Sequence, residues 1–198
     1  MIYIIPVVAA YLIGSLSFSF IIGRLVKGID IRKHGSGNAG ATNTLRVLGK
    51  GPAILVLALD VVKAIQAVWI GKWMAPDDVW VQVACGLAVI IGHNWPVFFG
   101  FRGGKGVATA IGVTATLCFL PALFAGIIAI GSIVITRYVS LGSLLFTALL
   151  PFFVWGMGRP LEILWGVIII GLFTFIRHRT NISKLVQGRE SKIGSKNL

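Results

Sequence analysis

The residues between positions 100 and 106 combine several glycines with two cations, Arg102 and Lys105. Glycine allows backbone N–H groups to approach a ligand and point at it, and lysine adds a full positive charge. A helix is predicted to begin at Val107, and a helix N-terminus carries unpaired donors and partial positive charge. The segment therefore predicts a phosphate-binding loop, with a flexible turn as the alternative. A nucleotide-binding P-loop is excluded, because Gly106 stands where that motif requires Ser or Thr.

A second glycine-rich loop spans residues 35–43 and contains a G-x-G-x-x-G pattern that starts at Gly35. Asp60 follows about twenty residues later, as in a dinucleotide-binding fold, but no strand is predicted before the loop and Asp60 lies within an apolar span. We therefore reject nucleotide binding and retain an anion-binding loop, with a solvated turn as the alternative. A short helix is predicted over residues 43–48, with Arg46 in its first turn. The neutral side-chain donors of the loop are Ser36, Asn38, Thr42 and Asn43.

Two further basic segments could contribute to the same site. Ser143 begins a predicted helix after an Arg-Tyr pair typical of membrane interfaces, and residues 177–185 could be a polybasic patch on anionic lipid. His178 and Asn181 are three residues apart, so they share a face if this tail is helical. His178 is the better candidate for a general base or an orienting group, because His93 is placed like an interfacial residue at the end of an apolar span.

The composition indicates a protein that lives in lipid. Of the 198 residues, 57% are hydrophobic and 12% are charged, whereas soluble domains carry roughly 25% charged residues. The net charge of +12 comes from short loops between apolar runs, which favours membrane orientation and anionic ligands and disfavours nucleic acid as a partner. Cys85 and Cys118 lie within apolar runs and lack metal-ligand or disulfide spacing, so no metal is expected.

We predict an all-α polytopic membrane protein with about seven transmembrane helices in one integral membrane domain, residues 1–198. The run 107–136 is too long for one crossing of a core about 30 Å thick, and it is shorter than two full crossings need. Two short helices, broken near Leu120-Pro121, would place every strongly basic segment on the inner side, as the positive-inside rule requires. The N-terminus is then outside and the C-terminus cytoplasmic. The remaining predicted spans are 2–23, 52–74, 80–95, 141–155 and 161–176.

Asp60 and Lys63 are unusual because both are ionisable residues within the second predicted span. Their spacing of three residues places them on one helix face. Charged groups inside a membrane are expensive and serve either function or structure. We interpret them as a buried pair that fixes helix packing rather than as part of the site.

The basic segments come from distant parts of the chain, but the predicted topology brings them to one membrane face. The sequence offers no Ser-His-Asp set, thiol nucleophile or metal cluster that would perform covalent or Lewis-acid chemistry. This pattern favours an enzyme that positions phosphate-bearing substrates next to lipid. The alternative is a phosphate or organophosphate transporter, which would need polar residues running through to the outer face.

Three groups of residues, in order along the chain, match the motifs of a known family. They are Gly35–Asn43 with Arg46, Gly92–Pro96 with Gly103–Thr109, and Arg177–Ile182 with Gly188 and Glu190. On these residues the chain resembles the bacterial acyl-phosphate-dependent glycerol-3-phosphate acyltransferases, which are integral membrane enzymes. The resemblance covers nearly the whole chain.

The resemblance implies transfer of an acyl group from acyl phosphate to the 1-hydroxyl of glycerol 3-phosphate, which releases inorganic phosphate and begins bacterial phospholipid synthesis. No cofactor, acyl carrier protein or acyl-CoA is expected, and membrane lipids are the other expected partners. The implied location is the bacterial cytoplasmic (inner) membrane, with the active site facing the cytoplasm.

The resemblance also assigns roles to single residues. Arg46 and the loop around Lys105 would hold glycerol 3-phosphate, and Ser36 with its neighbouring amides would hold acyl phosphate. The residues implied to complete the pocket are Ser143, His178 and Asn181. The further substrate-binding residues are Gly37, Asn38, Gly40, Thr42, Asn43, His93, Asn94, Gly103, Gly104 and Gly106.

Overall fold

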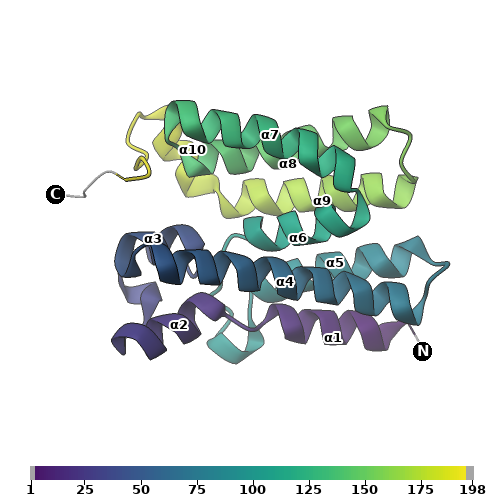
Figure 1. Ribbon diagram of the computed structural model, residues 1–198, viewed down its shortest axis with the longest axis horizontal. Coiled ribbons are helices and arrows are strands. Elements are labelled where there is room, and N and C mark those ends of the chain that lie inside the picture. The colour runs from purple at the N-terminus through teal and green to yellow at the C-terminus, as the bar shows by residue number, and fades with distance from the viewer. Residues whose placement is uncertain (1–2, 195–198) are drawn as a thin grey trace. The chain divides into compact units, whose positions relative to one another are not determined.

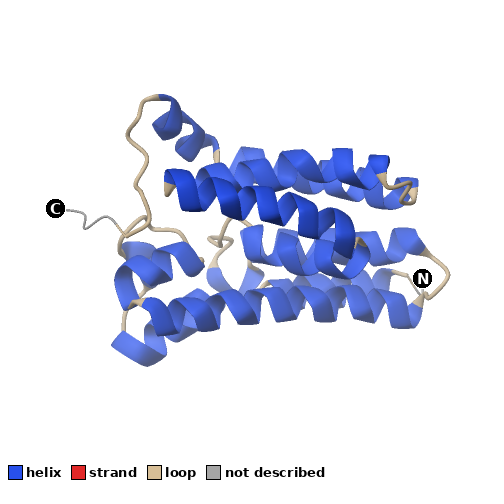
Figure 2. Cartoon of the chain, turned by 45° about the horizontal axis from the view of Figure 1, so that its top comes forward, coloured by secondary structure: helices blue, strands red, loops and turns tan. Residues whose placement is uncertain are grey.

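The computed structural model describes residues 3–194, and every regular element in that range is a helix (Figures 1 and 2). The predicted all-α class is therefore confirmed. The predicted start of the first span at Ile2 and residues 195 and 196 of the predicted basic tail lie outside this range. The helices are α1 (Ile4–Gly14), α2 (Phe18–Lys27), η1 (Ile31–Lys33), α3 (Ala41–Leu48), α4 (Lys50–Met74), α5 (Val79–Asn94), η2 (Val97–Phe99), α6 (Val107–Leu117), α7 (Phe119–Thr136), α8 (Val139–Gly156), α9 (Leu161–Arg177) and α10 (Arg179–Val186).

The helices pack as two compact units, an N-terminal unit up to Leu117 and a C-terminal unit from Cys118 onward. In the N-terminal unit α1, α4 and α5 contact one another, α6 packs on α4 and α5, and α2 and α3 contact α4 (Figure 1). In the C-terminal unit α8 lies between α7 and α9, and α10 contacts both α8 and α9. One integral domain over the whole chain stays a prediction.

Glycines allow the helices of the N-terminal unit to approach until their backbones touch. A Cβ atom added to Gly14 of α1 would lie 2.8 Å from Val89 Cα of α5, and one added to Gly92 of α5 would lie 2.9 Å from Ser15 N. Gly112 plays the same part between α6 and α4, where its Cβ would lie 2.9 Å from Ala64 Cβ. Small residues serve this purpose in membranes because lipid provides no hydrophobic drive for helix association.

The end of the C-terminal unit folds back onto the turn between α7 and α8. Ile193 N donates a hydrogen bond to Arg137 O at 2.8 Å, and the Arg137 guanidinium Nη2 donates to Ile193 O at 2.8 Å. Arg137 has a φ of +64°, which closes the helix α7 in a left-handed turn. The residues that follow α10 are therefore held against the start of α8.

All of the predicted apolar segments are helical, but fewer of them have spanning length. Five stretches are long and apolar enough to cross a membrane, and α9 with α10 adds a sixth if this pair, bent by 64°, forms one span. Helix α6 has 11 residues, about 16 Å of helix, which is short of a core about 30 Å thick. The orientation of the two termini stays a prediction.

Two of the predicted apolar segments, 2–23 and 107–136, are each divided between two helices. The break expected near Leu120-Pro121 is found at Cys118, and Pro121 lies in the first turn of α7, where a missing N–H is tolerated. The first span was predicted over residues 2–23, and a stretch of spanning length is found at Ile4–Lys27. Within it the helix is interrupted, because α1 ends at Gly14 and α2 begins only at Phe18.

Lys63 explains how the first span can break within a membrane protein. Its Nζ atom donates to the carbonyl oxygens of Gly14 at 3.0 Å and Leu16 at 2.7 Å, in place of the helical N–H groups that the break removes. Asp60 Oδ1 lies 2.8 Å from the same nitrogen, and both side chains are only 2% exposed. Backbone carbonyls have no water partners in lipid, so an internal donor is required. The predicted buried pair is confirmed.

We expect that Lys63→Met will destabilise the protein strongly. The substitution keeps an unbranched side chain but leaves Asp60 as an unpaired buried charge and two carbonyls without a donor. Breaking a buried ion pair by removing one partner costs about 3–5 kcal/mol. Thermal unfolding of the detergent-purified protein, followed by tryptophan fluorescence, measures the effect. The double variant Asp60→Asn/Lys63→Met should regain part of the loss, and a single variant with wild-type Tm would contradict the proposed capping by Lys63.

Candidate active site

Asn43 organises the first glycine-rich loop. Its Oδ1 accepts a hydrogen bond from Ser36 N at 2.8 Å, and its Nδ2 donates to the carbonyls of Ile31 at 3.1 Å and His34 at 3.0 Å. The side chain is buried, and Gly35, with a φ of +60°, packs directly against Oδ1. Both donors of the amide and one lone pair of its oxygen are thus used by the loop backbone. The structure therefore gives Asn43 a loop-holding role, and direct contact with a substrate stays a prediction.

Helix α3 begins at Ala41, two residues before its predicted start. The reason is Gly40, whose carbonyl accepts both the Thr44 N–H at 3.0 Å and the Thr44 hydroxyl at 3.1 Å. Arg46 consequently lies in the last turn of α3, not in the first turn as predicted. Its side chain is exposed, as is Ser36 in the preceding loop.

The second glycine-rich loop packs against the C-terminal end of α5. Gly104 N donates to His93 O at 3.0 Å, and Gly103 N donates to Asn94 O at 3.3 Å. A Cβ atom at Gly104 would overlap the His93 ring and lie 2.8 Å from Ala39 O. Ala39 belongs to the first loop. The two loops that the sequence singled out as anion-binding are therefore in direct contact, although they are distant from each other along the chain.

Lys105 and Gly106 lead into the N-terminus of α6, which begins at Val107 as predicted. Gly106 has a φ of +82°, and a Cβ atom there would lie 2.9 Å from Asn94 Oδ1. The Asn94 side chain is fully buried, and neither atom of its amide has a hydrogen-bond partner among the residues that the structure describes. The start of α6 therefore combines unpaired helix donors, a half-buried lysine and a buried amide.

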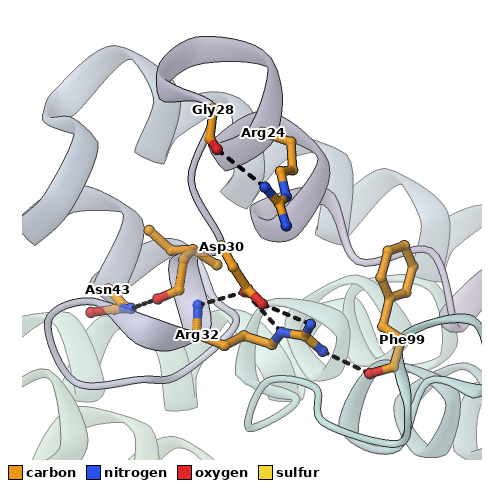
Figure 3. A network of polar contacts seen from close by, with 7 residues as sticks. Arg24, Gly28, Asp30, Arg32, Asn43 and Phe99 are labelled. Carbon is orange, nitrogen blue, oxygen red and sulfur yellow. Dashed lines mark hydrogen bonds and ion pairs between the residues drawn. The ribbon is translucent and has the colours of Figure 1, made fainter.

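Arg32 ties the first loop to the segment that precedes the second (Figure 3). Its Nε and Nη2 atoms each donate to one oxygen of Asp30 at 2.9 Å, and its Nη1 donates to Phe99 O at 2.7 Å. The guanidinium also lies over the Phe20 ring, 4.8 Å from its centroid. The hydrogen bond from Arg32 lowers the pKa of Asp30 below its ordinary value. The sequence analysis did not predict this contact between Arg32, Asp30 and Phe99.

In the C-terminal unit, Glu190 holds Asn181 and the start of α8 together. Its Oε1 accepts from Asn181 Nδ2 at 2.7 Å and from the Ser140 hydroxyl at 2.8 Å. The Ser143 hydroxyl donates to Val139 O at 2.8 Å within α8. Glu190 entered the sequence analysis only through a motif, since a single acid in a basic tail carries no spacing signal of its own.

His178 lies between α9 and α10, where the chain bends by 64°. Its Nδ1 is 2.8 Å from Thr174 O. A carbonyl can only accept, so Nδ1 carries the proton and Nε2 is the acceptor nitrogen of the neutral ring. The ring is 3% exposed. The contact with Thr174 O thus orients the ring of His178 through Nδ1.

The predicted site residues fall into two sets, one in each unit. The loop contact between Ala39 and Gly104 gathers most of the first set. Its members on or beside the two loops are Ser36, Gly37, Asn38, Gly40, Thr42, Asn43, His93, Asn94, Gly103, Gly104, Lys105 and Gly106, with Arg46 on α3. The second set is Ser143, His178 and Asn181. Within residues 3–194, no group of three or more His, Cys, Asp or Glu side chains could hold a metal ion.

Apolar helices of spanning length define a multi-pass membrane protein, and the two glycine-rich loops lie in contact within its N-terminal unit. The family model described as glycerol-3-phosphate acyltransferase matches residues 4–188. The chain belongs to this family, and it is an integral membrane acyltransferase. The family to which the motifs pointed is thus confirmed.

Individual relatives agree with the family match. A glycerol-3-phosphate acyltransferase of Halalkalibacterium halodurans is 56% identical over 196 residues, which cover 96% of this chain and 95% of the relative. One from Aquifex aeolicus is 44% identical over 94% of this chain and 96% of the relative. The crystal structure of PlsY (YgiH), an integral membrane glycerol 3-phosphate acyltransferase, in its glycerol 3-phosphate form has a TM-score of 0.92 and 43% identity, covering 97% of this chain and 96% of that one. Its lysophosphatidic acid form has a TM-score of 0.90 at the same identity.

We expect that Asn43→Asp will loosen the first loop. The carboxylate can still accept from Ser36 N, but its second oxygen faces the carbonyls of Ile31 and His34, which can only accept. Leaving buried groups unpaired costs about 1–3 kcal/mol each. The variant should therefore unfold at a lower temperature and lose most acyltransferase activity. Gln187→Glu, the same change at an exposed amide, is the matched control. Equal Tm and equal activity for the two variants would contradict the role of Asn43.

Proposed function

We propose that this protein transfers an acyl group from acyl phosphate to the 1-hydroxyl of glycerol 3-phosphate, giving 1-acyl-glycerol 3-phosphate and inorganic phosphate. Membership of the family supports glycerol 3-phosphate as the acceptor. The related PlsY structures are a glycerol 3-phosphate form and a lysophosphatidic acid form of that enzyme. Acyl phosphate as the donor is the finer part of the proposal. The observation that carries it is the contact of the two glycine-rich loops at Gly104 and Ala39, which puts two phosphate-suited surfaces side by side.

The chemistry explains why so few conventional catalytic groups are needed. An acyl phosphate is a mixed anhydride, already activated, with phosphate as a good leaving group. The glycerol oxygen attacks the acyl carbonyl carbon, an ester bond forms, and the bond from that carbon to the phosphate oxygen breaks. A phosphate oxygen takes the hydroxyl proton in our proposal. The protein then has to bring two anionic substrates together and stabilise the tetrahedral oxyanion, which dense cations and backbone amides do well.

The two loops are assigned different substrates. We place glycerol 3-phosphate at the loop of Lys105, with Arg46 as a second cation, and acyl phosphate at Ser36 and its neighbouring amides. The exposure of residues 35–37 supports approach of a phosphate to this loop. Roles in the reaction for Ser143, His178 and Asn181 also belong to the proposal.

His178 is assigned an orienting role. Its Nδ1–H is held by Thr174 O, so Nε2 can accept a hydrogen bond from a hydroxyl and aim it. The proposed location is the inner membrane, with phosphates at the cytoplasmic interface and acyl chains among the helices. The exposed apolar side chains of the described helices support contact with lipid acyl chains.

The test of the function is an assay of the purified protein in detergent with acyl phosphate and glycerol 3-phosphate. Phosphate release should depend on both substrates. Lys105→Ala and Arg46→Ala should each raise KM for glycerol 3-phosphate by roughly 10-fold to 100-fold, since a charged hydrogen bond is worth about 1.5–3 kcal/mol. Lys50→Ala, which removes an exposed cation outside both loops, is the control.

Two results would contradict these assignments. Loss of kcat with unchanged KM would remove the binding roles of Lys105 and Arg46. Movement of phosphate or glycerol 3-phosphate into vesicles that contain the protein, without formation of the acylated product, would replace the enzyme by the transporter alternative.

We expect that His178→Ala will slow turnover by less than the 10²–10⁴-fold, roughly, that loss of a general base produces. The acidic limb of the pH profile of kcat/KM should persist, because a substrate phosphate rather than His178 accepts the proton. Measurement of kcat/KM between acidic and neutral pH shows whether His178 or a substrate phosphate accepts the proton. Disappearance of that limb would make His178 the base, and unchanged turnover would leave it without an essential role.

A further inference from the structure

A row of buried polar side chains runs from the break between α1 and α2 to the second glycine-rich loop. It consists of Lys63, Asp60 and His93, all in the N-terminal unit. We propose that these three are positioning residues, which hold Gly104 and with it Lys105 where the phosphate of glycerol 3-phosphate binds. The inference rests on the proposed function, because it takes Lys105 as the phosphate ligand.

The row is anchored at the break in the first span. Lys63 Nζ is fixed by the carbonyls of Gly14 and Leu16, at 3.0 and 2.7 Å, and by Asp60 Oδ1 at 2.8 Å. The carbonyls belong to the backbone at a helix end, where they cannot rotate as a side chain can. The position of the ammonium is therefore set by the packing of α1 against α4.

His93 extends the row toward the loop. Its Nδ1 lies 3.2 Å from Lys63 Nζ and 3.4 Å from Asp60 Oδ1, and the ring is 6% exposed. An ammonium has three protons. The carbonyls, the carboxylate and the imidazole share them, so the plane of the imidazole depends on the ion pair behind it.

His93 contacts Gly104 of the second loop through both its carbonyl and its ring. Its carbonyl accepts the Gly104 N–H at 3.0 Å, and its ring packs so closely that a Cβ atom at Gly104 would lie 2.9 Å from Cε1. The same Cβ atom would lie 2.8 Å from Ala39 O in the first loop. Gly104 thus packs against both the histidine and the first loop, and Lys105 is the next residue. A rotation of the imidazole would displace Gly104 and with it Lys105.

The contact of the ion pair with His93 is more than the break requires. Lys63 must donate to the carbonyls of Gly14 and Leu16, and Asp60 neutralises its charge. Neither requirement explains why the polar ring of His93 lies against the pair, 3.2 Å from Lys63 Nζ. What hydrogen-bonded ions add is a single geometry, and supporting shells of this kind hold ligand-binding groups in place elsewhere.

Two variants test the row without leaving an unpaired charge. His93→Phe keeps the ring but removes both of its nitrogens, and the double variant Asp60→Asn/Lys63→Met removes both charges at similar volume. We expect each to raise KM for glycerol 3-phosphate by roughly 10-fold to 100-fold, the loss typical of outer-shell partners. KM for acyl phosphate should stay within about 2-fold, since even one misplaced hydrogen bond changes affinity more.

The matched control is Gln82→Met, at the opposite end of α5 from His93. Gln82 is also buried, and its Nε2 donates to Pro76 O at 3.2 Å. A purely structural effect would lower Tm and the active fraction in all variants and leave KM unmoved. Titration calorimetry of glycerol 3-phosphate against each purified variant measures binding independently of turnover.

The result that overturns the inference is wild-type KM and binding of glycerol 3-phosphate in both test variants, or an equal rise of both KM values. Lys105→Ala, measured alongside, distinguishes failure of the positioning role from failure of the proposed function. If Lys105→Ala weakens glycerol 3-phosphate binding and the test variants do not, the positioning role alone is wrong. If Lys105→Ala itself binds glycerol 3-phosphate normally, the assignment of this substrate to the loop of Lys105 fails, and the inference fails with it.

Discussion

The structure of the N-terminal unit depends on one buried ammonium group. Lys63 donates to the carbonyls at the end of α1 and is neutralised by Asp60 within the same helix, α4. Without a donor at this point, a helix could not stop at Gly14 inside an apolar environment, since lipid offers backbone carbonyls no partner. The break in turn lets α2 begin afresh and lead into the loops that hold the candidate site. The buried hydrogen bonds of Lys63 thus determine where the first span is interrupted, and with it where α2 and the following loop begin.

Glycine serves two purposes in this chain, and both follow from the absence of a side chain. In the helices, Gly14, Gly92 and Gly112 bring backbones together where lipid gives no hydrophobic drive. In the loops, Gly104 fits between His93 and Ala39, and a Cβ atom would separate the two loops. Close helix packing therefore fixes the position of the end of α5, against which the second loop packs. Close packing at Gly104 brings the two glycine-rich loops into contact.

The sequence predicted most of the architecture and the membership of the site, but not the contacts that hold the site. Apolar runs locate helices well because hydropathy is a local property, and the start of α6 at Val107 follows from glycine and charge alone. The break at Ser15–Ser17 carries no proline or glycine-rich signal of its own, because its cause is Lys63, nearly fifty residues later. Arg46 was placed in the wrong turn of α3, since the cap formed by Gly40 and Thr44 is a matter of geometry. Arg32 and Glu190 act through distant partners, Phe99 O and the Ser140 hydroxyl, that only folding brings near.

The division of labour in the site matches the chemistry proposed for it. A reaction whose donor is already activated needs positions and charges more than it needs a nucleophile, and the described loops supply a half-buried lysine and the buried side-chain amide of Asn94. Hydrogen bonds within the N-terminal unit keep these loops in shape. Asn43 Oδ1 accepts from Ser36 N in the first loop, Arg32 just before that loop donates to Phe99 O, and His93 O accepts from Gly104 N in the second loop. Much of the polar chemistry in the N-terminal unit therefore holds backbone in place around the residues proposed to bind phosphate.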